Sequence, residues 1–142
     1  MAENQIVVDA PRGRVFAVLA DPGSYAEWVL GAKAVRDADS TWPAPGSLLH
    51  HSSGAGPVTI DDSTEVLECD PPRRIVLLAR LGPVGAFRVE LVLDAVGEGR
   101  TTVTMREEPE EGIVQAIGPV GDAVGALRNK LSLRSLKRLA EG

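Results

Sequence analysis

With 142 residues, 44% of them hydrophobic and 25% charged, the chain has the length and composition of one globular domain with a sizeable core. A formal net charge of −5, with basic residues clustered only in the C-terminal segment, argues against nucleic acid as a partner. No apolar stretch approaches the roughly 18 to 20 residues of a bilayer-spanning helix, and no apolar signal segment follows a basic start. The sequence therefore predicts a cytoplasmic protein that does not insert stably into a membrane.

A strand over residues 5–8 opens the chain, and two short helices are expected to follow it. Asp9 stands before Pro11, a pattern typical of a helix start, so we expect Asp9 to cap the first helix. Asp21 repeats this pattern for the second helix, which is expected to end near Trp28. Turns rich in Gly and Pro then separate apolar runs that predict six further strands. These strands cover residues 32–39, 47–52, 58–69, 74–81, 86–96 and 101–107.

Alternation of apolar and charged residues assigns the two faces of the last strands. The apolar phase, which we expect to face the interior, contains Phe87, Val89, Leu91, Leu93, Val103 and Met105. The other phase carries Arg80, Arg88, Glu90 and Arg106. Because opposite charges on neighbouring strands stabilise one another, we expect these four side chains to form cross-strand pairs on a solvated face.

One carboxylate breaks the alternation. Glu107 falls in the inward phase of Val103 and Met105. A carboxylate that faces an apolar interior needs a partner or a raised pKa, and such exceptions are typical of functional sites. The alternative is that the strand has ended before this point, so that Glu107 belongs to a solvated acidic turn with Glu108.

His50 and His51 are adjacent in a predicted strand, so their side chains point to opposite faces and cannot share a metal ion. The chain has no other histidine, and it carries none of the common motifs for binding nucleotides, metals or redox groups. We therefore predict no metal and no cofactor. We assign His50 to the candidate site, although the pattern leaves open which histidine faces inward and whether its role is only structural. Trp28 lies either at the rim of a cavity or in the core as a packing anchor.

The C-terminal segment predicts one long helix with two apolar faces. Val120, Val124, Leu127 and Leu131 share a face that we expect to press on the sheet or on a cavity. Leu133, Leu136 and Ala140 lie on roughly the opposite face. That second face meets either the opening helices, which we favour, or a partner subunit. The basic residues Arg128, Lys130, Arg134, Lys137 and Arg138 are expected to be solvated.

Several segments of the chain form a recognisable set: residues 6–11 with 15–16, 21–28, 42–47, 70–74, 99–104 and 128–139. Together they resemble the SRPBCC superfamily, and within it the bacterial polyketide cyclase/dehydrase-like, START-related group. The resemblance implies an α+β helix-grip fold over residues 1–142 as a single domain. In that fold a seven-stranded antiparallel sheet curves around a long C-terminal helix and a deep hydrophobic pocket, and two short helices follow the first strand.

Function does not follow from this fold alone, because the superfamily includes lipid and hormone binders, aromatase/cyclases and oxygenase domains. The metal-binding histidines of the oxygenase domains have no match here. We expect a small hydrophobic ligand, lipid-like or polyketide-like, to bind in an internal cavity between the sheet and the C-terminal helix. The candidate ligand-binding residues are Trp28, His50, Phe87, Val89, Leu91, Val103, Met105, Glu107, Val124, Leu127 and Leu131. The alternatives are a cyclase/dehydratase-like enzyme that uses a pocket His or Glu as acid or base, and a protein-interaction module. A homodimer is left open.

Overall fold

Strands and helices follow one another in the predicted order. The computed structural model describes residues 2–29, 32–55, 58–80, 85–112 and 118–142, without the side chains of residues 2, 26, 32–36, 51–55, 58–62, 111–112 and 118–126. The elements are β1 (Ala2–Val8), α1 (Arg12–Ala20), η1 (Pro22–Ser24), α2 (Tyr25–Trp28), β2 (Ala32–Ala38), β3 (Leu48–Ala55), β4 (Val58–Asp70), β5 (Arg74–Arg80), β6 (Gly85–Ala95), β7 (Thr101–Gly112) and α3 (Gly118–Glu141). β7 is longer than predicted, because it pairs with β6 along almost the whole length of both strands.

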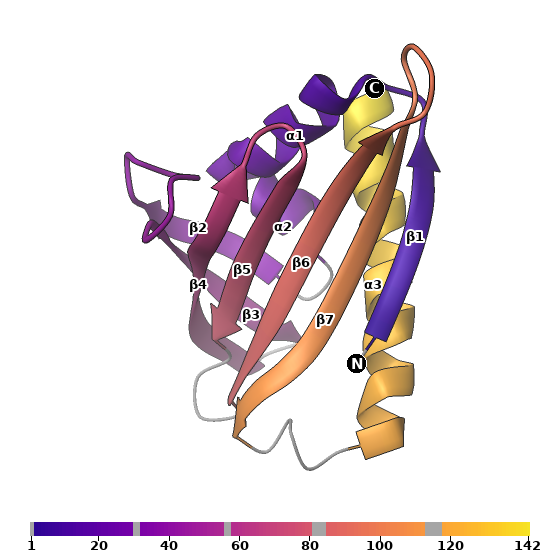
Figure 1. Cartoon of the computed structure of the whole chain (residues 1–142). Helices are drawn as coiled ribbons and strands as arrows, with labels where there is room; N and C mark the ends of the chain where they lie inside the picture. Colours follow the sequence, from indigo (N-terminus) through magenta and orange to yellow (C-terminus); the bar gives the residue numbers. More distant parts are fainter. Residues whose placement is uncertain (1, 30–31, 56–57, 81–84, 113–117) are drawn as a thin grey trace.

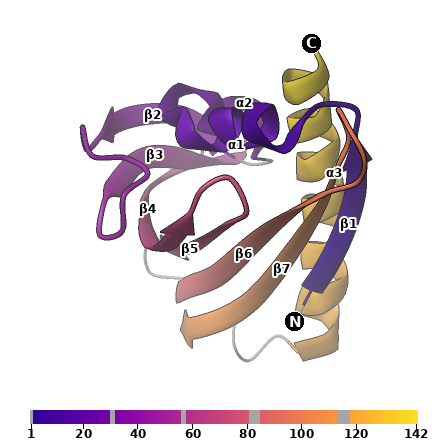
Figure 2. The ribbon, with the colours of Figure 1, turned by 45° about the horizontal axis from the view of Figure 1, so that its top comes forward.

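The seven strands form one antiparallel sheet in the order β1-β7-β6-β5-β4-β3-β2. Strands β2 to β7 are a meander, and β1 closes the order by pairing with β7, so the first and last strands of the chain are neighbours. The sheet is strongly curved, and α3 runs along its β1 and β7 end (Figure 1). The helices α1 and α2 lie near the C-terminal half of α3 (Figure 2). This arrangement is the predicted helix-grip architecture.

The core lies between the inner face of this sheet and the helices. It contains Val89, Leu91, Leu93, Val103 and Met105, the predicted inward phase of β6 and β7, which confirms the alternation. The other members are Val8, Ala10, Val15, Phe16, Leu19, Trp28, Val66, Ile75, Leu77, Leu133, Leu136 and Ala140. Because this cluster joins residues of α1 and α3, the second half of α3 packs within the chain, which was the favoured alternative.

The expected orientation of α3 is wrong for Leu127 and Leu131. Their side chains are 61% and 37% exposed, so they point outward instead of toward the sheet. The inward face of the described part of α3 consists of Asn129, Ser132, Leu133, Leu136 and Ala140, all of them buried. Because Asn129 and Ser132 on this face are polar, hydrophobic periodicity does not identify it as the inward face. The side chain of Val124, like that of Val120, lies outside the described residues.

The two predicted helix caps have different outcomes. Asp21 accepts a hydrogen bond of 3.0 Å from the Gly23 amide, as a capping residue should. Asp9 does not cap α1, because Pro11 occupies the N-cap position. The Asp9 carboxylate instead accepts a hydrogen bond of 3.0 Å from Arg100. This contact ties the connection after β1 to the start of β7.

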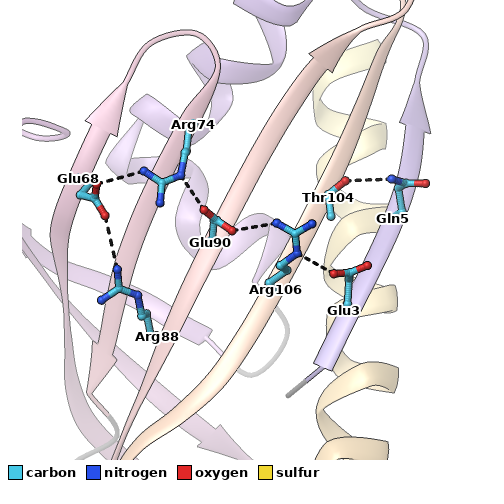
Figure 3. Close-up of polar contacts among 8 residues, drawn as sticks. All are labelled: Glu3, Gln5, Glu68, Arg74, Arg88, Glu90, Thr104 and Arg106. Carbon is cyan, nitrogen blue, oxygen red and sulfur yellow. Dashed lines mark hydrogen bonds and ion pairs between the residues drawn. The ribbon is translucent and has the colours of Figure 1, made fainter.

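The outer face of the sheet carries the predicted cross-strand ion pairs. Arg74 contacts Glu90 at 2.6 Å and Glu68 at 3.1 Å, and Arg106 contacts Glu90 at 3.1 Å and Glu3 at 2.6 Å (Figure 3). The hydrogen bond from Arg74 is the main cause that lowers the pKa of Glu90. Arg88 extends the network to Glu68 at 3.4 Å, and Arg80 pairs with Glu65 at 2.9 Å. These contacts confirm the prediction of paired charges on this face.

Candidate functional site

Glu107 is a buried carboxylate in the middle of β7. Glu107 is only 3% exposed, and it pairs in register with Val89 on β6 and Ala2 on β1. The prediction that Glu107 shares the inward face with Val103 and Met105 is confirmed. The alternative of a solvated acidic turn is wrong, because β7 continues beyond Glu107 to Gly112.

Arg128 on α3 is the partner of this carboxylate. Its guanidinium forms an ion pair and a hydrogen bond with Glu107, and the guanidinium carbon lies 5.6 Å from the centre of the Phe87 ring. At that distance a cation interacts favourably with the face of an aromatic ring. The sequence placed Arg128 in a solvated basic run, so this partner was missed. The one available signal was the unpaired inward carboxylate itself, which required a cation from some other element.

Burial is the main influence on the carboxyl group of Glu107 and raises its pKa above the ordinary value of 4.5. The charge of Arg128 and its hydrogen bond act in the opposite direction, but they do not cancel the effect of burial. Removal from water disfavours the charged form of any carboxyl group, whereas a neighbouring cation favours it. Glu107 therefore holds a proton more readily than a surface glutamate does, while keeping a cationic partner.

Asn129, the residue after Arg128, is a second polar group on the inner side of α3. It is fully buried, at 0% exposure, and among the residues that the structure describes neither its amide oxygen nor its amide nitrogen has a hydrogen-bond partner. The amide oxygen of Asn4 on β1 is also buried, and it too has no partner in the described part of the chain. Asn4 pairs in register with Met105, so it belongs to the inward phase of β1. Neither asparagine was selected from the sequence.

The apolar members of the predicted site that come from β6 and β7 lie on the same face of the sheet as Glu107. Val89, Leu91, Val103 and Met105 are buried in the core cluster, and Phe87 packs against that cluster beneath Arg128. All five come from β6 and β7 and have the same strand phase. The structure thus brings these residues together with Glu107, and their role in ligand binding stays a prediction.

Trp28 and His50 lie elsewhere. Trp28 is buried in the core cluster, and its ring is edge-on to that of Tyr25, with 6.1 Å between the ring centres and 65° between the ring planes. His50 occupies the outer phase of β3, because its neighbour Leu49 is the buried residue and pairs with buried Thr64 of β4. Of the two orientations that the sequence left open for His50, the structure thus shows the outward one. The side chain of His51 lies outside the described residues.

Among the described residues, no three His, Cys, Asp or Glu side chains come together in a way that would hold a metal ion. Within the same part of the chain, no helix has both the length and the apolar character needed to cross a bilayer. The polar groups described on the inner face near β1 and β7 include a carboxylate, a guanidinium and the amides of Asn4 and Asn129. These groups can hold a molecule by hydrogen bonds, and the carboxyl group can also exchange a proton.

A model of the family described as polyketide cyclase / dehydrase and lipid transport matches residues 2–141. The chain belongs to this family. The match spans the sheet and the C-terminal helix and includes both Glu107 and Arg128.

Solved structures share the fold at low sequence identity. The Zhui aromatase/cyclase from Streptomyces sp. R1128 is 18% identical with a TM-score of 0.74, and the alignment covers 99% of this chain and 92% of that one. Protein CV1439 from Chromobacterium violaceum is 22% identical with a TM-score of 0.71, at coverages of 99% and 96%. The di-domain aromatase/cyclase BexL of the BE-7585A biosynthetic pathway is 16% identical with a TM-score of 0.71, at coverages of 99% and 49%. No functionally curated protein matches the chain.

Proposed function

We propose that this protein binds a small hydrophobic molecule, lipid-like or polyketide-like, between the inner face of its sheet and α3. The observation that carries the proposal is the ion pair of the buried Glu107 with the half-buried Arg128, on a face that is otherwise mostly hydrocarbon. Taking a carboxylate out of water is expensive even when it is paired, and well-packed apolar side chains at such positions are often at least as stable. Stability of the fold alone therefore does not explain the pair, whereas orientation of a ligand does.

The guanidinium of Arg128 and the carboxylate of Glu107 can form hydrogen bonds with different groups of a ligand. An arginine has five N–H donors in one plane, so the contact with Glu107 leaves donors that can reach a ligand oxygen. The carboxylate in turn can accept a hydrogen bond from a ligand hydroxyl group. Phe87, Val89 and Met105 supply the apolar surface next to this polar point. Membership in a cyclase and lipid-transport family supports a ligand of this kind.

A dye-binding experiment tests the proposal. Nile red, a neutral apolar dye, should bind with saturation at one molecule per chain, and a polycyclic phenol or a fatty alcohol should displace it. Arg128→Met should weaken the binding of the phenol, since it removes the donor while keeping an apolar side chain of similar length. Arg134→Met is the matched control, because Arg134 is an exposed cation on the same helix. Absence of saturable binding to the unmodified protein would overturn the proposal.

Enzymatic catalysis is a second candidate, and the state of Glu107 is the observation that favours it. A carboxyl group with a raised pKa lies closer to neutral pH, where proton transfer to and from a substrate is most efficient. The structural neighbours named as aromatase/cyclases are consistent with such chemistry. A cyclase-like enzyme should lose turnover in Glu107→Gln while retaining the bound substrate, whereas a pure binding protein should return every test compound unchanged.

A further inference from the structure

The buried amide of Asn129 and the buried amide oxygen of Asn4 are not explained by the Glu107–Arg128 pair. Asn129 lies on the same helix face as Leu133 and Leu136, where an apolar side chain would pack without any need for hydrogen bonds. A buried amide without partners destabilises a protein, because it has lost its hydrogen bonds to water and gained none. Asparagine is also a poorer helix former than leucine. Folding alone would therefore favour an apolar residue at position 129.

Two contacts place Asn129 and Asn4 at the same level of the molecule. The Lys137 ammonium group donates to the Val7 carbonyl at 3.1 Å, and Arg128 contacts Glu107, which pairs in register with Ala2. The start of β1 therefore lies near Arg128 and its end near Lys137. The strand and the helix run in the same direction, as Figure 1 also shows.

The spacing along the two elements then fixes the level of each amide. From Val7 back to Asn4 is three strand residues, about 10 Å. From Lys137 back to Asn129 is eight helix residues, about 12 Å. Both side chains are on inward faces, so we place their three polar atoms, which have no partner among the described residues, at about the same level of β1 and α3.

We propose that Asn129, with Asn4 at the same level, is a hydrogen-bonding subsite for a neutral group of the ligand that carries a donor and an acceptor side by side. A carboxamide presents an N–H donor and a carbonyl acceptor in one plane, so its natural complement is another planar group of the same kind. A hydroxy-ketone, a carboxamide or an undissociated acid has this pattern. This inference rests on the proposed function and narrows the ligand class.

The charges near Asn129 argue against an anionic ligand group at this subsite. The guanidinium of Arg128 is already compensated by Glu107, and a second carboxylate there would face the first one. Lys130 and Arg134, which also lie in this part of α3, are exposed. A free fatty acid would therefore leave its carboxylate without a cation, whereas a neutral group meets no such cost.

Calorimetric titration with four naphthalene compounds tests the proposal. Naphthamide carries a donor and an acceptor, methyl naphthoate carries acceptors only, naphthoate is an anion at neutral pH, and methylnaphthalene is apolar. Asn129→Leu should weaken the binding of naphthamide about tenfold, the effect of one lost hydrogen bond in a buried site, and leave methylnaphthalene within about twofold. Naphthoate should bind no better than methylnaphthalene. Lys130→Gln, at the exposed next residue, is the control and should change none of these affinities.

The outcomes separate this inference from the proposed function. If all four compounds bind but Asn129→Leu binds naphthamide as tightly as the unmodified protein does, the amide subsite is wrong and the hydrophobic site stands. The amide subsite is also wrong if Asn129→Leu lowers the melting temperature without changing selectivity, because the amide is then structural. If no compound binds to the unmodified protein, both proposals fail. Asn129→Ser and Asn4→Leu provide the same comparison should Asn129→Leu not fold.

Discussion

The half-buried Arg128 of α3 and the buried Glu107 of β7 form an ion pair that joins the C-terminal helix to the last strand of the chain. The two residues are 21 positions apart in the chain, and the pair lies against the ring of Phe87 on β6. The pair connects three elements at the inner face of the sheet. Removing it should therefore change both the free energy of unfolding and the affinity for a ligand.

Removing only one residue of this pair should lower the free energy of unfolding more than removing both. Arg128→Met leaves a buried carboxylate without a cation and should lower the free energy of unfolding by about 3 kcal/mol. The double variant Glu107→Leu with Arg128→Met should recover most of that loss, because it removes the uncompensated charge. Urea unfolding at neutral pH measures both values. A double variant that is no more stable than Arg128→Met would show that the uncompensated carboxylate is not the cause of the loss.

The raised pKa of Glu107 should determine how this residue's contribution to the free energy of unfolding changes with pH. Its pKa is raised in the folded protein, mainly by burial, so the folded state binds more protons than the unfolded state between the ordinary value of 4.5 and the raised pKa. The contribution of Glu107 to stability is therefore full below pH 4.5 and is lost as the pH rises through the raised pKa. The difference in unfolding free energy between the unmodified protein and Glu107→Gln should decrease across this window.

Glu90 should show the opposite pH dependence in the same protein. The hydrogen bond from Arg74 lowers its pKa, so its contribution to stability is present above pH 4.5 and is lost as the pH falls through the lowered pKa. Unfolding curves of Glu90→Gln should therefore approach those of the unmodified protein in acid. Slopes of the same sign for Glu107→Gln and Glu90→Gln would contradict the assignment of the two environments.

The two leucines Leu136 and Leu127 on α3 should respond very differently to substitution. Leu136→Ala opens a cavity in the core and should cost about 2 to 5 kcal/mol, whereas Leu127 is exposed, so Leu127→Ala should change stability by about 0.5 kcal/mol or less. Leu136→Glu should prevent folding, since it places an unpaired charge in the core. Thermal unfolding monitored by circular dichroism checks all three. A folded, monomeric Leu136→Glu protein would mean that this face does not pack within the chain.

The strands and their faces could be predicted from the sequence because the information is local. Alternation at every second residue of β6 and β7 identifies the inward phase whatever the rest of the chain does. That pattern also singled out Glu107 as an inward carboxylate. The outward charges of the same strands were correctly expected to pair, since strands joined by short turns in a meander are neighbours in the sheet.

The orientation of α3 was decided by tertiary structure. A helix turns its apolar face inward only where no other requirement competes, and here Asn129 and Ser132 occupy part of the inward face while Leu127 and Leu131 lie outside. Hydrophobic periodicity therefore selected the wrong stripe. The phase of His50 is a similar case, because two adjacent histidines give no alternation from which the strand phase can be inferred.

The sequence by itself determined the order of the elements, the inner face of the sheet and the presence there of one misplaced carboxylate. Only the tertiary structure decided which cation meets that carboxylate and which amides are buried beside it. The reason is physical: the partner of Glu107 comes from a helix whose rotation is set by packing against β1, α1 and α2, and no local pattern in the chain records that rotation.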